Sequence, residues 1–420
     1  MNRLQKLKGT MDILPGESEV WQYIEKVLAE TARLSGFSEI RTPTIELTDL
    51  FCRGVGDTTD VVSKEMYSFD DKDGSNISLR PEGTAGVARA VIENGLYAGA
   101  MPLKLYYTGS FFRREKPQAG RSREFTQFGT ELYGSTLPEA DAEVILLARD
   151  IFRRFGLSGI KLHINSIGCP ECRPDYRNAL IEYFSAHSGE LCDTCRERLM
   201  RNPLRVLDCK NPSCRALAKD APKTLDHLCG DCRTHFDSLC GLLDACGVEY
   251  VTDPSVVRGL DYYTGTVFEF VAESIGAQST VCGGGRYDGL LESIGGPALP
   301  AVGFGMGITR LIQALRDEDL IPQPDTGADI YIAPMGADAA KKAFALAEEL
   351  RCRGVSAVTD LCARSVKAQM KYADKTHAKY ALVIGGSELE SGVAELRPMR
   401  GGESIKTDLS IEGIISAIRE

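Results

Sequence analysis

The spacing of apolar residues along the chain predicts several helices and strands. Apolar side chains recur every three to four positions over residues 16–35 and 138–155, which is typical of amphipathic helices. Residues 111–131 alternate aromatic with polar side chains at both ends, as strands with one buried face do. The middle of that stretch is a loop rich in proline, glycine and arginine. We therefore expect a hairpin with a basic tip.

The pattern continues beyond the second helix with one long interruption. Strand alternation is present over residues 161–165 and again over 250–270. A glycine run follows at 282–287, and residues 301–311 predict a strand that enters a helix. Between 169 and 246 the alternation fades while cysteine and charge become more frequent. We expect this interruption to be an inserted helical module.

A second domain is predicted after a linker at residues 321–327, which is rich in proline and glycine. Short apolar strands at 330–333, 357–359 and 381–385 then alternate with helical segments. Such alternation favours a small α/β domain with a largely parallel core.

Length and composition agree with this division. The chain has 420 residues, which suits two or three domains, and a formal net charge of -10. That charge argues against non-specific coating of nucleic acid but leaves room for a local basic surface. No apolar run approaches the roughly 20 residues needed to span a membrane, and the N-terminus lacks a signal-peptide core. We expect a cytoplasmic protein, in which the 14 cysteines would be reduced.

The hairpin combines the features of a binding site for an anion and a small molecule. Its loop carries five basic residues, namely Arg113, Arg114, Lys116, Arg121 and Arg123. Just beyond the loop, Gln127 and Glu131 are four residues apart and so lie on one face of a strand. A basic clamp beside a fixed carboxylate suggests a nucleotide next to a cationic or hydrogen-bond-donating ligand. A solvated hairpin with a charged tip is the alternative.

Three glycines in the strand before the last helix of this region offer a second indication. Gly303, Gly305 and Gly307 are a poor match to a dinucleotide-binding motif, because the spacing is wrong and no acidic residue follows about 20 positions later. A strand that lies flat beneath a planar ligand is the better interpretation, since glycine allows close approach. Arg310, one turn later, would direct a guanidinium at phosphate or carboxylate.

Together these motifs resemble those of a known enzyme family. The hairpin with Arg113, the glycine strand ending near Arg310 and the N-terminal segment around Pro43 resemble the three motifs of class II aminoacyl-tRNA synthetases. Residues 8–12, 80–84 and 258–265 resemble the signatures of the histidyl-tRNA synthetase family. The resemblance covers nearly the whole chain.

The resemblance implies a fold and a reaction. The fold would be an α+β catalytic domain over residues 1–325, with a mixed, mainly antiparallel sheet and the helical cysteine-rich insertion at about 169–246. An anticodon-binding α/β domain would follow at 326–420. The reaction would be histidine–tRNA ligation: activation of histidine with ATP and Mg²⁺, then transfer to tRNA(His). The family also implies a homodimer.

The resemblance assigns roles to individual residues. Arg113 and Arg258 would be catalytic and act on the α-phosphate. The histidine-binding residues would be Glu82, Gly83, Thr84, Gln127, Glu131, Tyr262 and Tyr263. The ATP-binding residues would be Arg113, Arg121 and Arg310. The tRNA-binding residues would be Gln118, Arg123, Arg364, Lys367 and Lys371.

Two of these assignments have ordinary structural alternatives. Strand alternation would place only one of Tyr262 and Tyr263 on the ligand face. Arg364, Lys367, Lys371 and Lys375 recur every three to four residues, which predicts one basic helical stripe. A solvated helix face is the usual explanation for such a stripe.

Other functions fit less of the sequence. A non-catalytic regulatory subunit that binds histidine or a partner enzyme would typically lack the signature at 258–263 and the C-terminal domain, and both are present. A zinc module that binds nucleic acid would explain only residues 169–246. The Glu131 and Tyr262–Tyr263 set argues against another class II synthetase.

The cysteines of the insertion have metal-ligand spacing. Two Cys-x₂-Cys pairs are separated by 19 residues, as in zinc ribbons. In chain order the eight residues form two possible structural zinc sites, Cys169, Cys172, Cys192 and Cys195, then Cys209, Cys214, Cys229 and Cys232. An interleaved pairing is the alternative, as is an insertion with incidental thiols.

Overall fold

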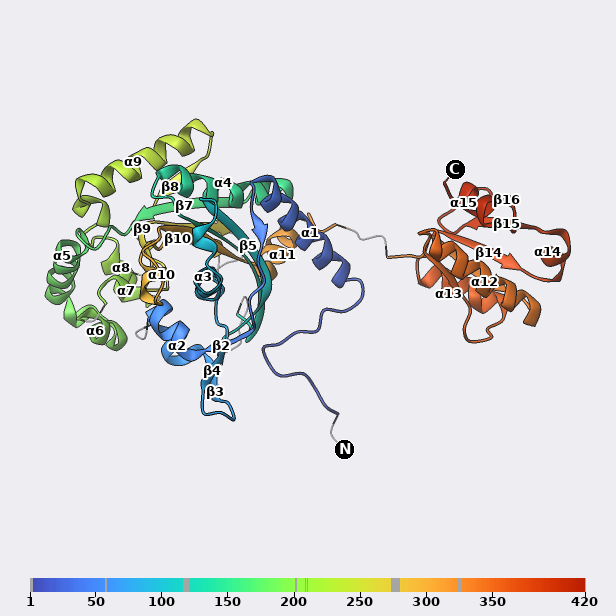
Figure 1. Ribbon diagram of the computed structural model, residues 1–420, viewed down its shortest axis with the longest axis horizontal. Coiled ribbons are helices and arrows are strands. Elements are labelled where there is room, and N and C mark those ends of the chain that lie inside the picture. The colour runs from blue at the N-terminus through green and yellow to red at the C-terminus, as the bar shows by residue number, and fades with distance from the viewer. Residues whose placement is uncertain are drawn as a thin grey trace. The chain divides into compact units, whose positions relative to one another are not determined.

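The computed structural model contains two compact units, one that includes Trp21–Pro322 and one that begins after Pro322 (Figure 1). The residues that it describes are 3–56, 59–115, 121–200, 202–207, 209, 211–272, 280–322 and 326–419. Within these ranges no helix is both long and apolar enough to cross a membrane.

An eight-stranded sheet forms the centre of the first unit. Its strands follow the order β1 (Ser38–Glu39), β5 (Leu103–Phe112), β6 (Glu124–Tyr133), β11 (Ala301–Gly307), β10 (Thr280–Arg286), β9 (Thr264–Ala272), β7 (Ile160–Ser166) and β8 (Tyr250–Thr252). Among the described strands of this sheet, only β1 with β5 and β7 with β8 pair in parallel. The sheet is therefore mixed and mainly antiparallel, as the sequence predicted.

The N-terminal helix agrees with the expected helix at 16–35, and the segment after it serves two sheets. Helix α1 (Ser18–Leu34) ends before the edge strand β1. Pro43 lies between β1 and β2 (Ile45–Leu47), and β2 belongs to a separate three-stranded sheet with β4 (Asn76–Leu79) and β3 (Tyr67–Asp70). The residues before and after Pro43 thus belong to two different sheets.

Besides α1 and the insertion, the described part of the first unit has further helices around the strands. They include α2 (Thr48–Phe51), α3 (Thr84–Glu93), α10 (Leu290–Ser293) and α11 (Ile308–Asp317). Another, α4 (Pro138–Arg154), packs on β6, β10 and β11. The Phe152 ring of α4 lies 5.2 Å from that of Phe270 on β9, so apolar side chains fill this face of the sheet.

A buried ion pair fixes α4 to strand β10. The Arg286 guanidinium is bonded to Asp141, whose side chain is fully buried, and Arg286 also donates to the carbonyl of Ser135. His235 lies 3.3 Å from the same carboxylate. Burial opposes ionisation of Asp141, but His235 and Arg286 more than offset it, and the pKa of Asp141 is lowered.

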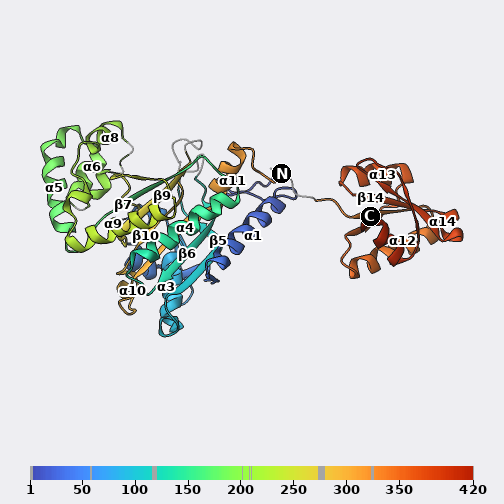
Figure 2. The same cartoon turned by 90° about the horizontal axis from the view of Figure 1, so that it is seen from above.

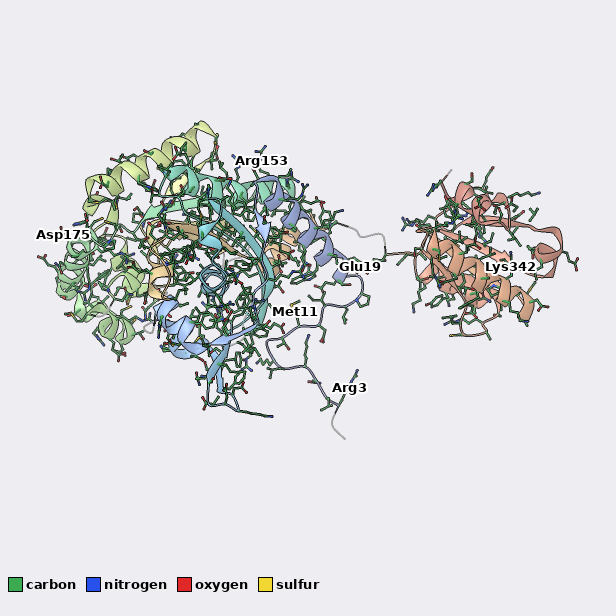
Figure 3. The ribbon with its side chains drawn as sticks, in the orientation of Figure 1. Arg3, Met11, Glu19, Arg153, Asp175 and Lys342 are labelled. Carbon is green, nitrogen blue, oxygen red and sulfur yellow. The ribbon has the colours of Figure 1, made fainter. Side chains whose placement is uncertain are left out.

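The insertion is helical, as expected, and lies between β7 and β8 in the chain. Its helices are α5 (Arg173–Ala186), α6 (Asp193–Leu199), α7 (Leu204–Leu207), α8 (Pro212–Ala218) and α9 (Gly230–Ala245). Figure 2 shows α5, α6 and α8 gathered at one end of the unit. Asp175, labelled in Figure 3, marks the exposed side of α5.

The second unit is a five-stranded α/β domain. Its strand order is β13 (Ala357–Thr359), β12 (Ile330–Pro334), β14 (Tyr380–Ile384), β15 (Val393–Pro398) and β16 (Ile405–Asp408). The first three strands are parallel and the last two antiparallel. Its helices are α12 (Ala337–Cys352), which carries the exposed Lys342 of Figure 3, α13 (Val366–Lys375), α14 (Gly386–Ser391) and α15 (Ile411–Arg419).

Candidate active site

One face of the large sheet collects the polar residues that the sequence singled out. Glu131 on β6 is paired in register with Gly303 on β11, and Gly129 with Gly305. Tyr107 on β5 is paired with Gly129 from the other side. Residues in register point to the same face of a sheet, so these side chains share one face with Gln127.

The glycines of β11 make room for side chains of β6. A Cβ atom added to Gly303 would collide with the Glu131 carboxylate and with a backbone carbonyl, and one added to Gly305 would collide with the Gln127 amide. The glycine strand was expected to lie beneath a planar ligand. In the structure, Gln127 and Glu131 themselves lie across it.

Glu131 is a fully buried carboxylate with three hydroxyl partners. It accepts hydrogen bonds from Thr84 Oγ1 at 2.8 Å and from the Tyr107 hydroxyl at 3.3 Å. The hydroxyl of Tyr287 also donates to it. Burial raises the pKa of Glu131 to about 8, although the hydroxyl donors oppose the rise.

Tyr262 and Tyr263 both face this region, which corrects the expectation from strand alternation. Their ring centroids are 4.7 Å apart, and the Tyr287 ring lies 5.4 Å from Tyr262. Strand β9 begins only at Thr264, so the two tyrosines belong to a loop. A loop does not impose the two-residue alternation of a strand. The result is a set of three aromatic rings beside Glu131.

Glu82 is held at the start of helix α3. Its carboxylate accepts the backbone N–H groups of Thr84 and Ala85 at 2.8 and 2.9 Å. Burial raises the pKa of Glu82, while these bonds and the charge of Arg113 partly offset the rise. Gly83, between Glu82 and Thr84, lies against the Tyr107 ring, and a Cβ atom at this position would collide with the ring. The turn therefore fixes Glu82 and Thr84 beside Glu131.

Arg258 occupies a strained loop next to the tyrosines. Its φ of 60° lies in the left-handed region, which is uncommon for residues other than glycine and often found at functional sites. The guanidinium pairs with Glu269 of β9 and lies 5.9 Å from the centroid of the Tyr263 ring. Burial lowers its pKa, but Glu269 outweighs this and raises it.

A cluster of three arginines lies at the hairpin end of the same face. Arg113 donates to the carbonyl of Pro81 at 3.0 Å, and Arg121 pairs with Glu115 at 2.9 Å. Arg310 donates to the carbonyl of Thr280 at 2.6 Å. Burial, then the charges of Arg121 and Arg113, lower the pKa of Arg310. Three mutually repelling cations at one place favour binding of a polyanion.

The predicted tRNA-binding residues lie in different settings. The backbone N–H of Arg123 donates to the carbonyl of Gly9 at 2.7 Å. Gln118 lies outside the described residues. Lys367 and Lys371 are exposed on α13. Arg364 precedes that helix, which begins at Val366, so it is not part of a helical stripe. Its side chain is bonded to Asp360 and lies 4.5 Å from the centroid of the Tyr372 ring.

The cysteines of the insertion group differently from the chain-order quartets. The sulfurs gather as Cys169, Cys172, Cys229 and Cys232, and as Cys192, Cys195, Cys209 and Cys214. The chain leaves the sheet after β7 and returns at β8, its parallel neighbour. The first and last pairs therefore meet, and the two middle pairs are left to each other. The chain-order quartets are therefore wrong, and each observed group combines one pair from each quartet, as in the alternative that the sequence left open.

Three further residues of the site were not predicted. Tyr107 and Tyr287 are hydrogen-bonded to Glu131, and Glu269 holds Arg258. The sequence offered a signal for Glu269, since it is a lone carboxylate in an apolar strand. It offered none for Tyr287, whose place depends on the turn after β10.

Comparison with known proteins identifies the family. The model of the histidyl-tRNA synthetase family matches residues 9–311, and that of the anticodon-binding domain matches 329–420. The chain is 52% identical over 413 residues to a histidine–tRNA ligase of Caldanaerobacter subterraneus, covering 98% of both. It is 50% identical over 402 residues to one of Desulforamulus reducens, covering 96% of both.

A solved structure supports the same family. The apo histidyl-tRNA synthetase of S. aureus is 38% identical and superimposes with a TM-score of 0.84 over 100% of both chains. The chain therefore belongs to the histidyl-tRNA synthetase family, among the class II aminoacyl-tRNA synthetases whose fold the sequence predicted.

The buried charge of Glu131 leads to a prediction about pH. The usual pKa of a glutamate is 4.5, and in the fold it is about 8, so between these values the unfolded chain releases a proton that the folded chain keeps. Wild-type stability thus falls as pH rises through this window. Glu131→Gln cannot titrate, and its stability relative to wild type should rise by up to about 1.4 kcal/mol per pH unit.

Denaturant unfolding of both proteins from pH 5 to 9 checks this expectation. The exposed Glu292→Gln is the matched control and should show no such trend. A difference between Glu131→Gln and wild type that stays flat across the window would contradict the account of Glu131.

Proposed function

We propose that this chain is a histidine–tRNA ligase, which activates histidine with ATP and transfers it to tRNA(His). The family supports this reading over a non-catalytic regulatory subunit. The observation that carries the proposal is the pairing, on one sheet face, of a buried carboxylate among tyrosines with a cluster of arginines. The first suits an imidazole and the second a triphosphate.

Recognition of the imidazole is assigned to Glu131 with Tyr263. An imidazole offers one donor and one acceptor in its neutral form, and a carboxylate or carboxyl group and a phenol can satisfy both. Glu131 cannot swing away, because three hydroxyl donors and Gly303 surround it. A site built this way leaves buried groups unpaired when the imidazole is missing, which rejects other amino acids by roughly 10⁴.

Recognition of the histidine α-ammonium is assigned to Glu82, Thr84 and Gln127, with Gly83 and Tyr262 completing the wall. Each Glu82 oxygen accepts one backbone N–H, which leaves a second lone pair free on each. Burial raises the pKa of Glu82, and the two backbone N–H donors and the charge of Arg113 only partly offset this rise. The positive charge of a bound ammonium would favour the ionised carboxylate further.

The chemical step joins histidine to the α-phosphate. A carboxylate oxygen of histidine forms a bond to the α-phosphorus while the bond to the bridging oxygen of pyrophosphate breaks, and pyrophosphate leaves with the electron pair. Such a transfer needs alignment and charge neutralisation more than covalent help. We assign this to Arg113 on one side and Arg258 on the other. Arg258 is ready for the role because Glu269 and its loop fix its direction.

The remaining phosphates of ATP are assigned to Arg121 and Arg310. Mg²⁺ usually enters with ATP and is held by one or two carboxylates together with the phosphates. Glu115 and Glu269 are two of the carboxylates near these arginines, and Glu65 is another. Either Glu115 or Glu269 would fit an oxygen-ligand site for Mg²⁺.

Binding of tRNA is assigned to two places. Gln118 and Arg123 of the hairpin would meet the acceptor end, and Lys367 and Lys371 of the anticodon-binding domain would meet phosphates, with Arg364 beside them. Local basic patches suffice for a polyanion even when the net charge is -10.

We also propose a cytoplasmic homodimer, with the segment around Pro43 at the subunit interface by resemblance to the family.

The reaction is tested by ATP–pyrophosphate exchange with each amino acid in the absence of tRNA. Histidine alone should support exchange, because only the imidazole satisfies Glu131 and Tyr263. Charging of tRNA(His) should follow. No exchange with any amino acid would favour the regulatory subunit, and exchange with another amino acid would refute the assignment of substrate.

The role of Arg258 is tested by Arg258→His. Loss of a guanidinium that acts on the transition state should lower kcat by about 10²–10³, while KM for histidine changes little. The exposed Arg153→His on α4, labelled in Figure 3, is the control and should retain wild-type kcat. A rise in KM without a fall in kcat would show that Arg258 only binds substrate.

A further inference from the structure

The eight clustered cysteines of the insertion have the geometry of metal ligands. Within each group of four, the sulfur atoms all lie within 4.8 Å of one another. In the first group, which we call the outer cluster, Cys172 Sγ lies 3.4 Å from Cys169, 3.7 Å from Cys229 and 3.6 Å from Cys232. In the second, the inner cluster of Cys192, Cys195, Cys209 and Cys214, Cys192 and Cys209 are 3.9 Å apart.

These distances match one ion at the centre of four thiolates. Zinc binds cysteine sulfur at about 2.3 Å in a tetrahedron, which places neighbouring sulfurs about 3.8 Å apart. A disulfide would need a separation of about 2.05 Å. None of the eight clustered cysteines forms a disulfide, and each is buried or half-buried. Four soft sulfur ligands in a tetrahedron favour zinc over magnesium or calcium.

Backbone groups around the clusters support the same conclusion. The N–H of Cys169 donates to Cys172 Sγ at 3.3 Å, and that of Cys192 donates to Cys214 Sγ at 3.2 Å. The N–H of Asn211 lies 3.5 Å from Cys209 Sγ. Such outer bonds orient thiolate ligands toward a metal.

The folding of the insertion also needs the two clusters. Helices α6, α7 and α8 have only seven, four and seven residues, and helices this short are marginal without other support. The inner cluster joins α6 to α8. The outer cluster joins the start of α5 to the start of α9, because Cys172 and Cys229 directly precede those helices. Two cross-links thus define a small module, as structural zinc does.

The insertion in turn holds the loop of Arg258 and Tyr263. Arg173, next to Cys172, donates to the carbonyl of Tyr263. Arg205, which lies between Cys195 and Cys209, donates to the carbonyl of Gly259 at 2.7 Å and to Asp261 at 3.3 Å. Asn202 from the same stretch also donates to Asp261 at 3.3 Å. The residues that contact the loop are thus the ones that the clusters position.

We propose that the insertion binds two structural zinc ions, one in each cluster, and that these ions position the active-site loop. The zinc sites go beyond the proposed function and do not depend on it. The role of the two ions in positioning the loop does rest on the proposed function. Zinc has no part in the chemical step, because both clusters act through the loop rather than on substrate.

Metal content tests the zinc sites without any assay of activity. Protein purified without chelator should hold two zinc ions per chain by elemental analysis. Cys229→Ser and Cys192→Ser should each hold one, whereas Cys229→His and Cys192→His keep a zinc ligand and should hold two. Cys246→Ser, at an exposed cysteine just after α9, is the control and should also hold two.

Substitution with Co²⁺ gives a second readout. Each cluster should give the intense visible bands of tetrahedral Co²⁺ with thiolate charge transfer, and each serine variant should lose half of the intensity. Less than one zinc per chain, iron in its place, or zinc that survives Cys192→Ser together with Cys229→Ser would overturn the metal sites.

Removal of zinc tests the positioning role. Chelation should raise KM for histidine or lower kcat of exchange at least tenfold, and added zinc should restore both. The hydrogen–deuterium exchange of residues 258–263 should rise at the same time. Two zinc ions whose removal leaves exchange kinetics and loop protection unchanged would overturn the positioning role while leaving the sites in place.

Discussion

The side chain of Glu131 lies across β11 at Gly303, one of three glycines that alternate along this strand, and most of the candidate active site is arranged around that contact. Gly303 leaves the space, and Thr84, Tyr107 and Tyr287 supply hydroxyl donors from α3, β5 and the turn after β10. A buried carboxylate without such donors would cost several kcal/mol. The need to satisfy Glu131 therefore brings three separate elements to one point.

The other end of the site depends on charge rather than on burial alone. Arg113, Arg121 and Arg310 lie close enough to repel one another, while Glu82 and Glu131 lie on the same sheet face. Histidine carries a cation, an imidazole and a carboxylate, and its carboxylate must approach a phosphate. Under the proposed function, a face with carboxyl groups at one end and guanidinium groups at the other would orient such a molecule in one direction.

The parts of this fold that follow local rules could be predicted from the sequence. The hairpin, the helical insertion and the C-terminal α/β domain depend on periodicity and on turn residues, which a single sequence displays. The mainly antiparallel sheet was expected only from the resemblance to the family. Gln127 and Glu131 could be placed on one strand face for the same reason.

The rest depended on contacts between distant segments. The loop at 258–263 has the composition of a strand, yet Arg258 adopts a positive φ because Glu269 and the insertion hold it. The cysteine pairing follows from where the chain leaves and re-enters the sheet, which spacing does not reveal. Arg364 precedes the helix that the basic spacing predicted, since that helix begins at Val366, and its side chain pairs with Asp360.

The direct test of the central role of the Glu131 contact is the KM for histidine of alanine variants in β11. Gly303→Ala displaces Glu131 and should raise this KM at least tenfold, or about 1.4 kcal/mol, while KM for ATP changes little. Gly305→Ala displaces only the Gln127 amide and should raise the KM for histidine less. Gly307→Ala should hardly change it, because the added Cβ would make only ordinary contacts with the Arg310 side chain, at 3.9 Å or more. A folded Gly303→Ala protein with an unchanged KM for histidine would contradict the account.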